Sequence, residues 1–265
     1  MQNKVIVITG ASAGIGAALA ELVVRGGARA ALLARREKEL TEVAARLQGK
    51  ALALVTDVTR RPDIERAVET VLAELGTIDV WVNNAGRGIS RLVSELTDED
   101  FDQMMNVNVK AVLHCMQAVL PHFRERGKGH IINVSSMLGR LPIAPFRSAY
   151  SASKHALNSL TANLRMELSQ SFPQIHVSSV HPGVVATEFG SNALHGGMDS
   201  RKFPGAQSAA EVAAVIADVI ENPRADAYTR SGAQTVIVNY YAAEDMGRAE
   251  QQPPFMNSAP KSPQV

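Results

Sequence analysis

The strongest constraint on the fold is an alternation of short apolar segments with longer amphipathic ones that continues over most of the 265 residues. Short apolar runs, often β-branched, predict buried strands, and apolar residues at helical spacing predict amphipathic helices. We expect strands at 5–8, 29–33, 51–55, 78–82, 130–134 and 176–181. We expect helices at 15–23, 37–47, 64–75, 101–126, 150–171 and 209–220.

This alternation predicts an α/β fold in which one parallel sheet is covered by helices on both faces, because parallel strands need crossover connections. Right-handed crossovers make it a doubly wound, Rossmann-like sheet with three α/β/α layers. We expect one domain over residues 1–250, with a last strand at Thr235–Val238. The glycine-rich stretch 188–208 is expected to form a lid over the substrate. Residues 251–265 hold four prolines and are expected to form a mobile or subunit-docking tail.

The charge balance and the length of the apolar runs exclude several classes of protein. Twenty-seven basic and 26 acidic residues give a formal net charge of +1, so no overall field attracts nucleic acid or an anionic membrane. No apolar run approaches the ~18 residues of a membrane span, and no export signal follows Met1. Cys115 is the only cysteine, which excludes an intramolecular disulfide. We therefore expect a cytoplasmic protein that acts on a small molecule.

A glycine-rich turn, Thr9–Gly16, joins the first expected strand to the first expected helix. Gly10 allows a tight turn, and Gly14 and Gly16 carry no side chain that would keep phosphates from the backbone. The free N–H groups and the positive dipole end of the helix favour an anion there. The turn predicts a dinucleotide pyrophosphate site, with a purely structural turn as the alternative. The residues between the glycines are expected to contact the cofactor as well: Ser12, Ala13 and Ile15.

The spacing of these glycines, Gly-x3-Gly-x-Gly after a threonine, is similar to that of the short-chain dehydrogenase/reductase family. Further segments in the matching order extend the resemblance from Lys4 to about Glu188. The resemblance implies a nicotinamide cofactor and places Asp57 beside its adenine ring. The structural alternatives are a surface aspartate at Asp57 and a plain turn at 84–86. The resemblance also places around the cofactor Val58, Asn84, Ala85 and Gly86.

Tyr150 and Lys154 lie four residues apart, so they project from the same face of the helix expected at 150–171. A tyrosine has an ordinary pKa of about 10, and a nearby ammonium group favours the phenolate. The same pattern also occurs on helices where the tyrosine packs and the lysine is solvated. The family resemblance implies that Tyr150 is the catalytic acid or base. It implies that Lys154 lowers the pKa of Tyr150 and binds the nicotinamide ribose.

Two pairs of neighbouring residues offer further catalytic candidates. Ser135 and Ser136 end the fifth expected strand, where a hydroxyl can orient the substrate oxygen or merely satisfy strand-end backbone groups. The resemblance selects Ser136, although the separation from the catalytic tyrosine is one residue longer than in the family pattern. It selects Asn108, rather than Asn106, as the asparagine that interrupts the helix and holds a water of a proton relay by its carbonyl.

The segment after the sixth expected strand, Pro182–Thr187, resembles the part of the family that packs against nicotinamide. The resemblance implies that Pro182 and Gly183 contact the cofactor. It implies that Val185 offers backbone groups to the carboxamide and that Thr187 offers a hydroxyl. A Pro-Gly turn is the structural alternative. Segments expected to border the substrate pocket contain Phe146, Phe189, Leu194, His195 and Met198, with ordinary packing as the alternative for each.

The end of the second expected strand favours NADP(H) over NAD(H). NAD-selective enzymes place an acidic residue there to bind the ribose 2′-hydroxyl, whereas this strand ends with Ala34 followed by Arg35 and Arg36. The Arg35 guanidinium can hold a 2′-phosphate in a bidentate contact. Ala13 stands where some relatives carry a second basic residue, and arginines at a helix start are often solvated, so NAD(H) stays the alternative.

Together these features predict an NADP(H)-dependent oxidoreductase that transfers a hydride between nicotinamide and a carbonyl or alcohol, acting mainly as a ketone or aldehyde reductase. Alcohol oxidation by the same residues and a non-catalytic NADP(H)-sensing protein are the alternatives. No metal is expected, because the seven histidines lack ligand-like spacing. The resemblance implies a homodimer or homotetramer that pairs through the helices expected at 101–126 and 150–171.

Overall fold

Within residues 1–251, which are the residues described in this computed structural model, seven parallel strands form one sheet. The strand order is β3-β2-β1-β4-β5-β6-β7. The doubly wound parallel sheet predicted from the sequence is confirmed. The expectation for the tail falls outside the described residues except at Gln251. The strands are β1 (Val5–Thr9), β2 (Arg29–Ala34), β3 (Ala51–Val55), β4 (Val80–Asn83), β5 (Gly129–Val134), β6 (Ile175–His181) and β7 (Asp226–Tyr228).

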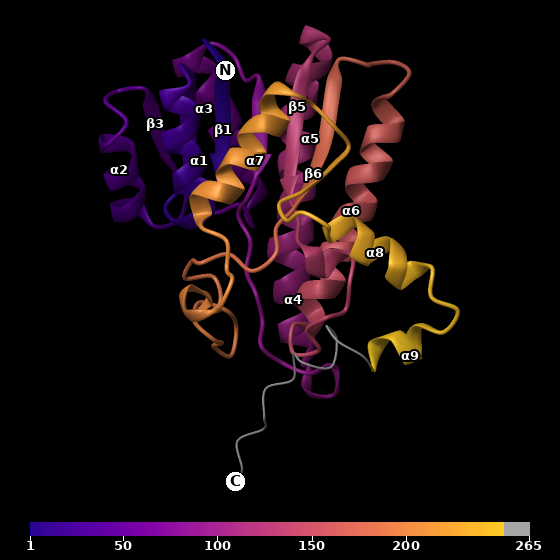
Figure 1. The fold of residues 1–265 in the computed structure, drawn as a ribbon. Coiled ribbons are helices and arrows are strands. Elements are labelled where there is room, and N and C mark those ends of the chain that lie inside the picture. The colour runs from indigo at the N-terminus through magenta and orange to yellow at the C-terminus, as the bar shows by residue number, and fades with distance from the viewer. Residues whose placement is uncertain (252–265) are drawn as a thin grey trace.

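Helices cover both faces of the sheet, so that it lies between two helical layers (Figure 1). Side chains alternate between the faces along each strand, which places Ile6 and Ile8 in one core cluster and Val5 and Val7 in the other. The helices packed on the first cluster are α1 (Gly14–Arg25), α2 (Glu37–Ala45) and α7 (Ala209–Glu221). Those packed on the second are α3 (Arg61–Leu75), α5 (Ala111–Arg126) and α6 (Ser148–Leu168).

The single helix expected at 101–126 is interrupted. Its first part, α4 (Asp98–Met105), begins at a capping box in which Thr97 and Asp100 satisfy each other's backbone N–H groups. A π-helical turn, Asn106–Lys110, then leads into α5. Such turns often mark functional sites because they alter the local hydrogen bonding of a helix. Asn108 lies at the centre of this turn.

The prediction of a last strand at Thr235–Val238 is wrong, because these residues belong to α8 (Ala233–Tyr241). Their β-branched side chains favour a strand locally. However, the buried side chains of the segment recur at helical spacing, as Ala233, Ile237 and Tyr240. Ile237 and Tyr240 pack against Leu141, and this tertiary burial outweighs the local preference. The seventh strand is the short β7, and α8 is followed by α9 (Met246–Glu250).

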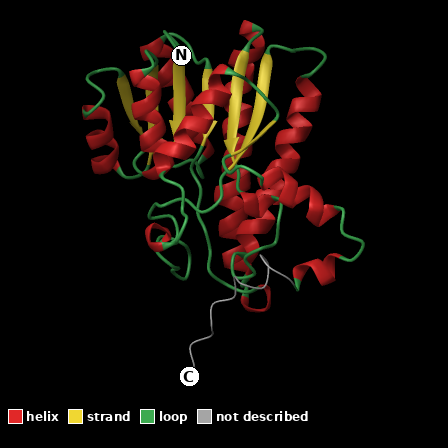
Figure 2. Ribbon diagram, viewed as in Figure 1, coloured by secondary structure: helices red, strands yellow, loops and turns green. Residues whose placement is uncertain are grey.

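Loops gather at the edge of the sheet toward which the strand arrows point (Figure 2). Among them, residues 188–208 contain a short 3-10 helix, Ser200–Lys202. Leu194 accepts a backbone hydrogen bond from Ser90 at 3.0 Å and donates one, at 2.9 Å, to the carbonyl oxygen of Gly88. His195 Nε2 lies 2.6 Å from Asp100 Oδ1. The segment is therefore attached both to the chain that follows β4 and to the start of α4.

Candidate active site

The carboxyl ends of β1 and β4 are joined by side-chain hydrogen bonds. The Thr9 hydroxyl accepts from the backbone N–H groups of Asn84 and Ala85, each at 3.0 Å. The Asn84 amide donates in return to the carbonyl oxygens of Thr9 at 2.9 Å and Gly10 at 3.2 Å. These bonds fix the spacing between the two segments in which the sequence places the cofactor.

The backbone of the glycine turn takes conformations and makes close approaches that side chains would block. Gly10 has φ +66° and Gly14 has φ +55°, a region that side chains disfavour. A Cβ at Gly16 would collide with the Gly10 carbonyl oxygen, and one at Gly10 would lie 2.9 Å from the Ala85 Cα. The N-cap of α1, Ala13, makes no side-chain hydrogen bond, so the first N–H groups of the helix are available to an anion. These features fit a dinucleotide, whose phosphates would bind to the free N–H groups at the start of α1.

Two arginines lie where β2 ends, beside the glycine turn. Arg36 donates from Nε to Ser12 Oγ at 3.3 Å and forms long ion pairs with Glu39 at 3.5 Å and Glu188 at 3.8 Å. Arg35 is exposed and has no ion-pair partner within residues 1–251. Of the two arginines, Arg35 is therefore the one whose charge is not paired with a carboxylate.

Asp57 and Val58 follow β3 at the same edge of the sheet, because parallel strands end together. The Asp57 carboxylate accepts from the Thr59 N–H at 3.0 Å and from the Thr59 hydroxyl at 2.7 Å. Val58 packs against the second core cluster. Asp57 thus closes the turn that follows β3, and its place beside an adenine ring stays a prediction.

The loop after β6 lies across from the glycine turn. The Pro182 carbonyl accepts a 2.8 Å hydrogen bond from the loop that follows β5, and Val185 pairs with the end of the 188–208 segment. A Cβ at Gly14 would lie 3.1 Å from the Thr187 methyl group. Gly183 lies against the side chain of Arg230. Thr187 therefore faces the glycine turn, and Pro182 is tied to the Ser136 loop.

Tyr150 and Ser136 meet at the carboxyl end of β5. Burial raises the pKa of Tyr150, while a hydrogen bond from Ser136 and the charge of Arg147 act in the opposite direction. The neighbouring Ser135 has a buried hydroxyl without a hydrogen-bond partner in the described part of the chain. Of the two candidate serines, Ser136 is the one that contacts the phenol.

Lys154 lies one helical turn beyond Tyr150 on α6, with Nζ 5.8 Å from the centre of the Tyr150 ring. Its ammonium group donates to the Val134 carbonyl oxygen at 2.9 Å. Burial lowers the pKa of Lys154 to about 8. Ser136 and Arg147 act to lower the pKa of Tyr150, and the lowering by Lys154 that the sequence predicts stays a prediction. A lysine with this pKa can exchange a proton near neutral pH.

Asn108 is fully buried, and its side chain is engaged by its neighbours. Its Oδ1 accepts from the Arg87 N–H at 3.0 Å, and its Nδ2 donates to the Arg87 carbonyl at 2.9 Å and to Ser153 Oγ at 3.1 Å. A Cβ at Gly86 would lie 3.1 Å from Asn108 Oδ1 and 3.8 Å from Lys154 Nζ, so these three residues converge. Since its side chain is committed, any contact of Asn108 with a water falls to its backbone.

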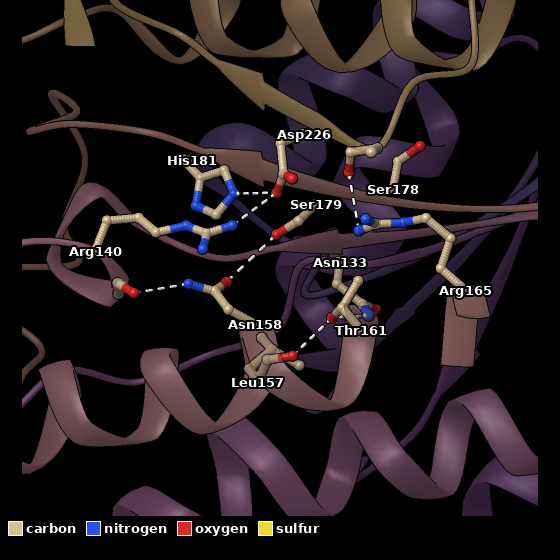
Figure 3. A network of polar contacts seen from close by, with 12 residues as sticks. Asn133, Arg140, Leu157, Asn158, Thr161, Arg165, Ser178, Ser179, His181 and Asp226 are labelled. Atoms are coloured by element: carbon tan, nitrogen blue, oxygen red, sulfur yellow. Dashed lines mark hydrogen bonds and ion pairs between the residues drawn. The ribbon is translucent and has the colours of Figure 1, made fainter. Parts of the chain in front are cut away.

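A buried polar network behind Ser136 was not predicted from the sequence (Figure 3). Asn158, on the α6 face that carries the tyrosine and the lysine, donates to the Gly139 carbonyl at 2.8 Å. His181 Nε2 lies 2.9 Å from Asp226 Oδ1, and His181 Nδ1 lies 3.4 Å from the Ser136 carbonyl oxygen. These contacts hold the loop that carries Ser136 at two points. The helical spacing of Asn158 from the catalytic pair was the signal that could have found it.

A comparison with known families decides what this arrangement is. The sequence model of the short chain dehydrogenase family matches residues 4–196. The chain belongs to this family. An uncharacterised oxidoreductase of Staphylococcus epidermidis is 37% identical to it over 187 residues, which cover 71% of this chain and 80% of that relative. The short-chain dehydrogenase described here is accordingly an oxidoreductase.

Solved structures of the family share the fold. A short chain dehydrogenase/reductase from Burkholderia phymatum in complex with NAD has a TM-score of 0.84 at 24% identity, covering 100% of this chain and 98% of the other. An alcohol dehydrogenase from Thermococcus sibiricus complexed with 5-hydroxy-NADP has a TM-score of 0.74 at 29% identity, covering 86% and 95%. Nicotinamide cofactors of both kinds are thus bound within the family.

Three further observations concern membrane, metal and thiol chemistry. No helix in residues 1–251 has both the length and the hydropathy needed to cross a membrane. Over the same range, no three His, Cys, Asp or Glu side chains are grouped so that they could hold a metal ion. Cys115 is buried, and burial raises the pKa of its thiol to about 12. This thiol therefore stays protonated near neutral pH and is a poor nucleophile.

Proposed function

We propose that this short-chain dehydrogenase is an NADP(H)-dependent reductase of ketones or aldehydes, with Tyr150 as the proton donor. One observation carries the proposal: Ser136, Tyr150, Lys154 and Asn108 converge beside a glycine turn that fits a pyrophosphate. A protein that only senses NADP(H) has no need of this set of groups.

The side chains divide the chemistry between them. Bound NADPH supplies the hydride. Tyr150 stays protonated because burial raises its pKa, and it gives this proton to the carbonyl oxygen that Ser136 orients. Lys154, whose pKa burial lowers to about 8, restores the proton and holds the nicotinamide ribose. The backbone of Asn108 binds a water that connects Lys154 to solvent.

Arg35 supports NADP(H) as the cofactor. The strand β2 ends at Ala34, so no carboxylate is placed to bind a ribose 2′-hydroxyl, and Arg35 is exposed beside it. The NADP pool in cells is usually reduced, which favours reduction of a carbonyl over oxidation of an alcohol. In the reverse direction the same groups act with Tyr150 as the base.

We also propose that two copies pair through α5 and α6, and that residues 188–208 act as the lid of the site. A surface groove runs between these two helices, and a second copy packed on it would bury its apolar lining. The apolar residues of the groove are Leu113, Met116, Leu120, Pro121, Leu160 and Leu164.

The test follows NADPH and NADH absorbance in parallel, with wild type and Tyr150→Phe, against a panel of ketones and aldehydes. We expect Tyr150→Phe to lower kcat by at least about 100-fold and to leave the Kd of NADPH within twofold, on the order of what a general acid contributes. Arg35→Ser should raise the KM of NADPH about tenfold and leave that of NADH unchanged, because it removes one charged contact. An undiminished rate in Tyr150→Phe would overturn the catalytic assignment. Binding of both cofactors without turnover of any carbonyl or alcohol would favour the sensing alternative.

A further inference from the structure

His195 lies in the segment 188–208 and is bound through both nitrogens of its ring. Its Nε2 lies 2.6 Å from Asp100 Oδ1, at the start of α4, and its Nδ1 lies 3.1 Å from Arg91 Nη2, in the chain that follows β4. A guanidinium only donates hydrogen bonds, so Nδ1 accepts from Arg91 and Nε2 carries the proton that is donated to Asp100. The imidazole therefore bridges two other parts of the chain in a single tautomer.

The Asp100 carboxylate is buried and relies on the donors around it. It is 5% exposed, and its Oδ2 lies 3.5 Å both from the Thr97 backbone nitrogen and from Arg91 Nε. The contact with His195 is much shorter than either of these. The His195 hydrogen bond is also the main cause that holds the pKa of Asp100 below its ordinary value. Because a buried carboxylate without donors is unfavourable, release of His195 has a cost at Asp100.

Arg91, the second partner of His195, is attached to the helix that carries the catalytic tyrosine. The Arg91 N–H donates to the Phe146 carbonyl at 2.7 Å. The Arg91 carbonyl accepts from the hydroxyl of Ser148, the first residue of α6, at 2.6 Å. Tyr150 follows two residues later on α6. The imidazole is therefore fastened to a part of the chain whose position is fixed relative to Tyr150.

The backbone of His195 is strained. Its φ is +60°, in a region that residues with a side chain disfavour. Gly196 also has a positive φ, of +75°, but a glycine takes this conformation without cost. A strained residue persists only where the surrounding contacts hold it. The two ring contacts of His195 therefore hold a turn that would otherwise favour another conformation.

The turn held by His195 belongs to the segment that reaches the catalytic tyrosine. Leu194, the preceding residue, makes the two backbone hydrogen bonds that join 188–208 to the chain after β4. Six residues before His195, the Phe189 ring lies edge-on to the Tyr150 ring, with 5.5 Å between the ring centres. The position of Phe189 against Tyr150 thus depends on how firmly this segment is docked.

We propose that His195 is a positioning residue: by bridging Asp100 and Arg91 it docks the lid and so raises the affinity of the enzyme for its carbonyl substrate. The inference rests on the proposed function, in which residues 188–208 cover the site of a reductase. If the lid is docked for only a fraction of the time, the apparent affinity for substrate falls by that fraction. The docked complex itself is unchanged, so the rate at saturating substrate is preserved.

His195→Asn tests this role, because asparagine is too short to make both ring contacts and yet tolerates a positive φ. The KM is measured at saturating NADPH for whichever of acetophenone, 2,3-butanedione and benzaldehyde wild type reduces fastest. We expect it to rise about tenfold, as for a docked fraction of about one tenth, with kcat within about threefold. His195→Gln keeps an N–H donor at about the place of Nε2 and should restore most of the wild-type KM. A loss confined to kcat would overturn the inference.

A double-variant cycle tests whether His195 acts through Asp100. Asp100→Asn keeps an acceptor for the cap of α4 but removes the charge, so it should raise KM by about threefold. If the two residues act as a pair, the double variant should raise KM about tenfold, as His195→Asn does alone. Multiplied effects of the two substitutions would overturn the pairing. Asn192 is exposed on the lid, and Asn192→Ala should leave KM as it is.

Hydrogen exchange of the cofactor-free protein, followed by mass spectrometry, measures docking without any turnover. The N–H groups of Ser90 and Leu194 join the lid to the chain after β4, so they are released when the lid undocks. We expect peptides containing them to exchange at least about tenfold faster in His195→Asn, and at the wild-type rate in Asn192→Ala.

The exchange rates separate this inference from the proposed function. Unchanged exchange in His195→Asn would overturn the docking role, even if Tyr150-dependent reduction of a carbonyl were observed. Faster exchange with an unchanged KM would overturn the link between docking and substrate affinity. If wild type reduces none of the three carbonyls, faster exchange in His195→Asn alone still supports His195 as the residue that docks the lid, although the proposed function fails.

Discussion

The two halves of the sheet prepare their parts of the site in different ways. Around β1, β2 and β3 the buried side chains are mainly aliphatic, and the cofactor would bind at the glycine turn and the start of α1. Around β5, β6 and α6 many polar side chains are buried: Asn133, Ser135, Ser136, Ser153, Lys154, Asn158, Thr161, Ser178, Ser179 and His181. The first half therefore works through its backbone, and the second through side chains.

This difference follows from what each half has to do. A pyrophosphate only accepts hydrogen bonds, so fixed N–H groups and a helix dipole suffice to hold it. A proton transfer needs side chains with adjusted pKa values, and burying such groups requires further polar groups to pair with them, as in Figure 3. We therefore expect the first half to be sensitive to added atoms and the second to be sensitive to pH.

The largest expected effect concerns the stability of the protein at acid pH. His130 lies on β5, with Nε2 2.8 Å from Ser178 Oγ, and burial lowers its pKa to about 3. The folded protein keeps this imidazole neutral, whereas the unfolded chain binds a proton below about pH 6.5. The free energy of unfolding is thus unaffected by this group above pH 6.5. It falls by on the order of 5 kcal/mol as the pH falls toward 3, because only the unfolded chain binds the proton. No histidine precedes His114, so the first half lacks this sensitivity.

Urea unfolding between pH 4 and 7 measures this acid dependence. His130→Leu should flatten it, at the expense of some stability at neutral pH where the Ser178 contact is lost. His155 is exposed, and His155→Leu should leave the dependence as in wild type. An acid dependence in His130→Leu equal to that of wild type would show that another group sets it.

Lys154→Met is expected to abolish turnover and yet to stabilise the cofactor-free protein. Burial lowers the pKa of Lys154 from 10.5 to about 8, so at pH 7 the folded protein holds an ammonium group in an unfavourable place. The penalty is complete below pH 8 and disappears between 8 and 10.5, where the unfolded chain still binds the proton. The variant should be more stable than wild type by up to about 3 kcal/mol at pH 7. The free-energy cost of leaving the Val134 carbonyl without a hydrogen bond reduces this gain.

Thermal unfolding of the cofactor-free protein at pH 7, 9 and 10.5 tests this gain, which should shrink as the pH rises. Lys110 is exposed, so Lys110→Met should change stability little at any of these values. If Lys154→Met is no more stable than wild type at pH 7, the cost of burying the ammonium group is already compensated by its hydrogen bond.

The same division explains what the sequence could predict. The glycine turn and the pair Tyr150 and Lys154 could be singled out as candidates because backbone requirements and helical spacing are local properties of the sequence. Arg147 and His181 were not, since their roles depend on groups brought from other elements, such as Ile89 and Asp226. The prediction of a strand at Thr235–Val238 failed for the same reason. Burial against a leucine that is distant in the sequence makes this segment helical, against its local preference for a strand.

A methyl group in the glycine turn tests the sensitivity of the first half to added atoms. In Gly16→Ala the new Cβ would collide with the Gly10 carbonyl, which is backbone and cannot turn aside. We expect the Kd of NADPH, measured by fluorescence titration, to rise about 10- to 100-fold, as overpacking typically costs about 1–3 kcal/mol. Gly49 has φ +75° and open space around its Cα, so Gly49→Ala should cost about 1 kcal/mol of stability without changing that Kd. Equal Kd values for the two variants would contradict the fit of the turn to the cofactor.

The smallest expected effect concerns Asn158, which positions the Ser136 loop without being placed in contact with a ligand. Asn158→Ala removes the hydrogen bond to the Gly139 carbonyl. We expect kcat to fall about tenfold, as for one buried hydrogen bond, with the Kd of NADPH unchanged. Because Ser136 lowers the pKa of Tyr150, a displaced serine should also move the pH profile of kcat toward higher pH.

Two further variants separate positioning from simple loss of stability. Asn158→Asp keeps an acceptor for Ser179 but lacks the amide donor to Gly139, so it should lose as much activity as Asn158→Ala. Asn163 is exposed on the same helix, and Asn163→Ala should leave kcat and its pH profile as they are. If Asn158→Ala also keeps the wild-type rate and profile, backbone contacts alone hold the Ser136 loop. In that case the two halves of the sheet would prepare the site in the same way, and the buried polar side chains of the second half would serve stability rather than chemistry.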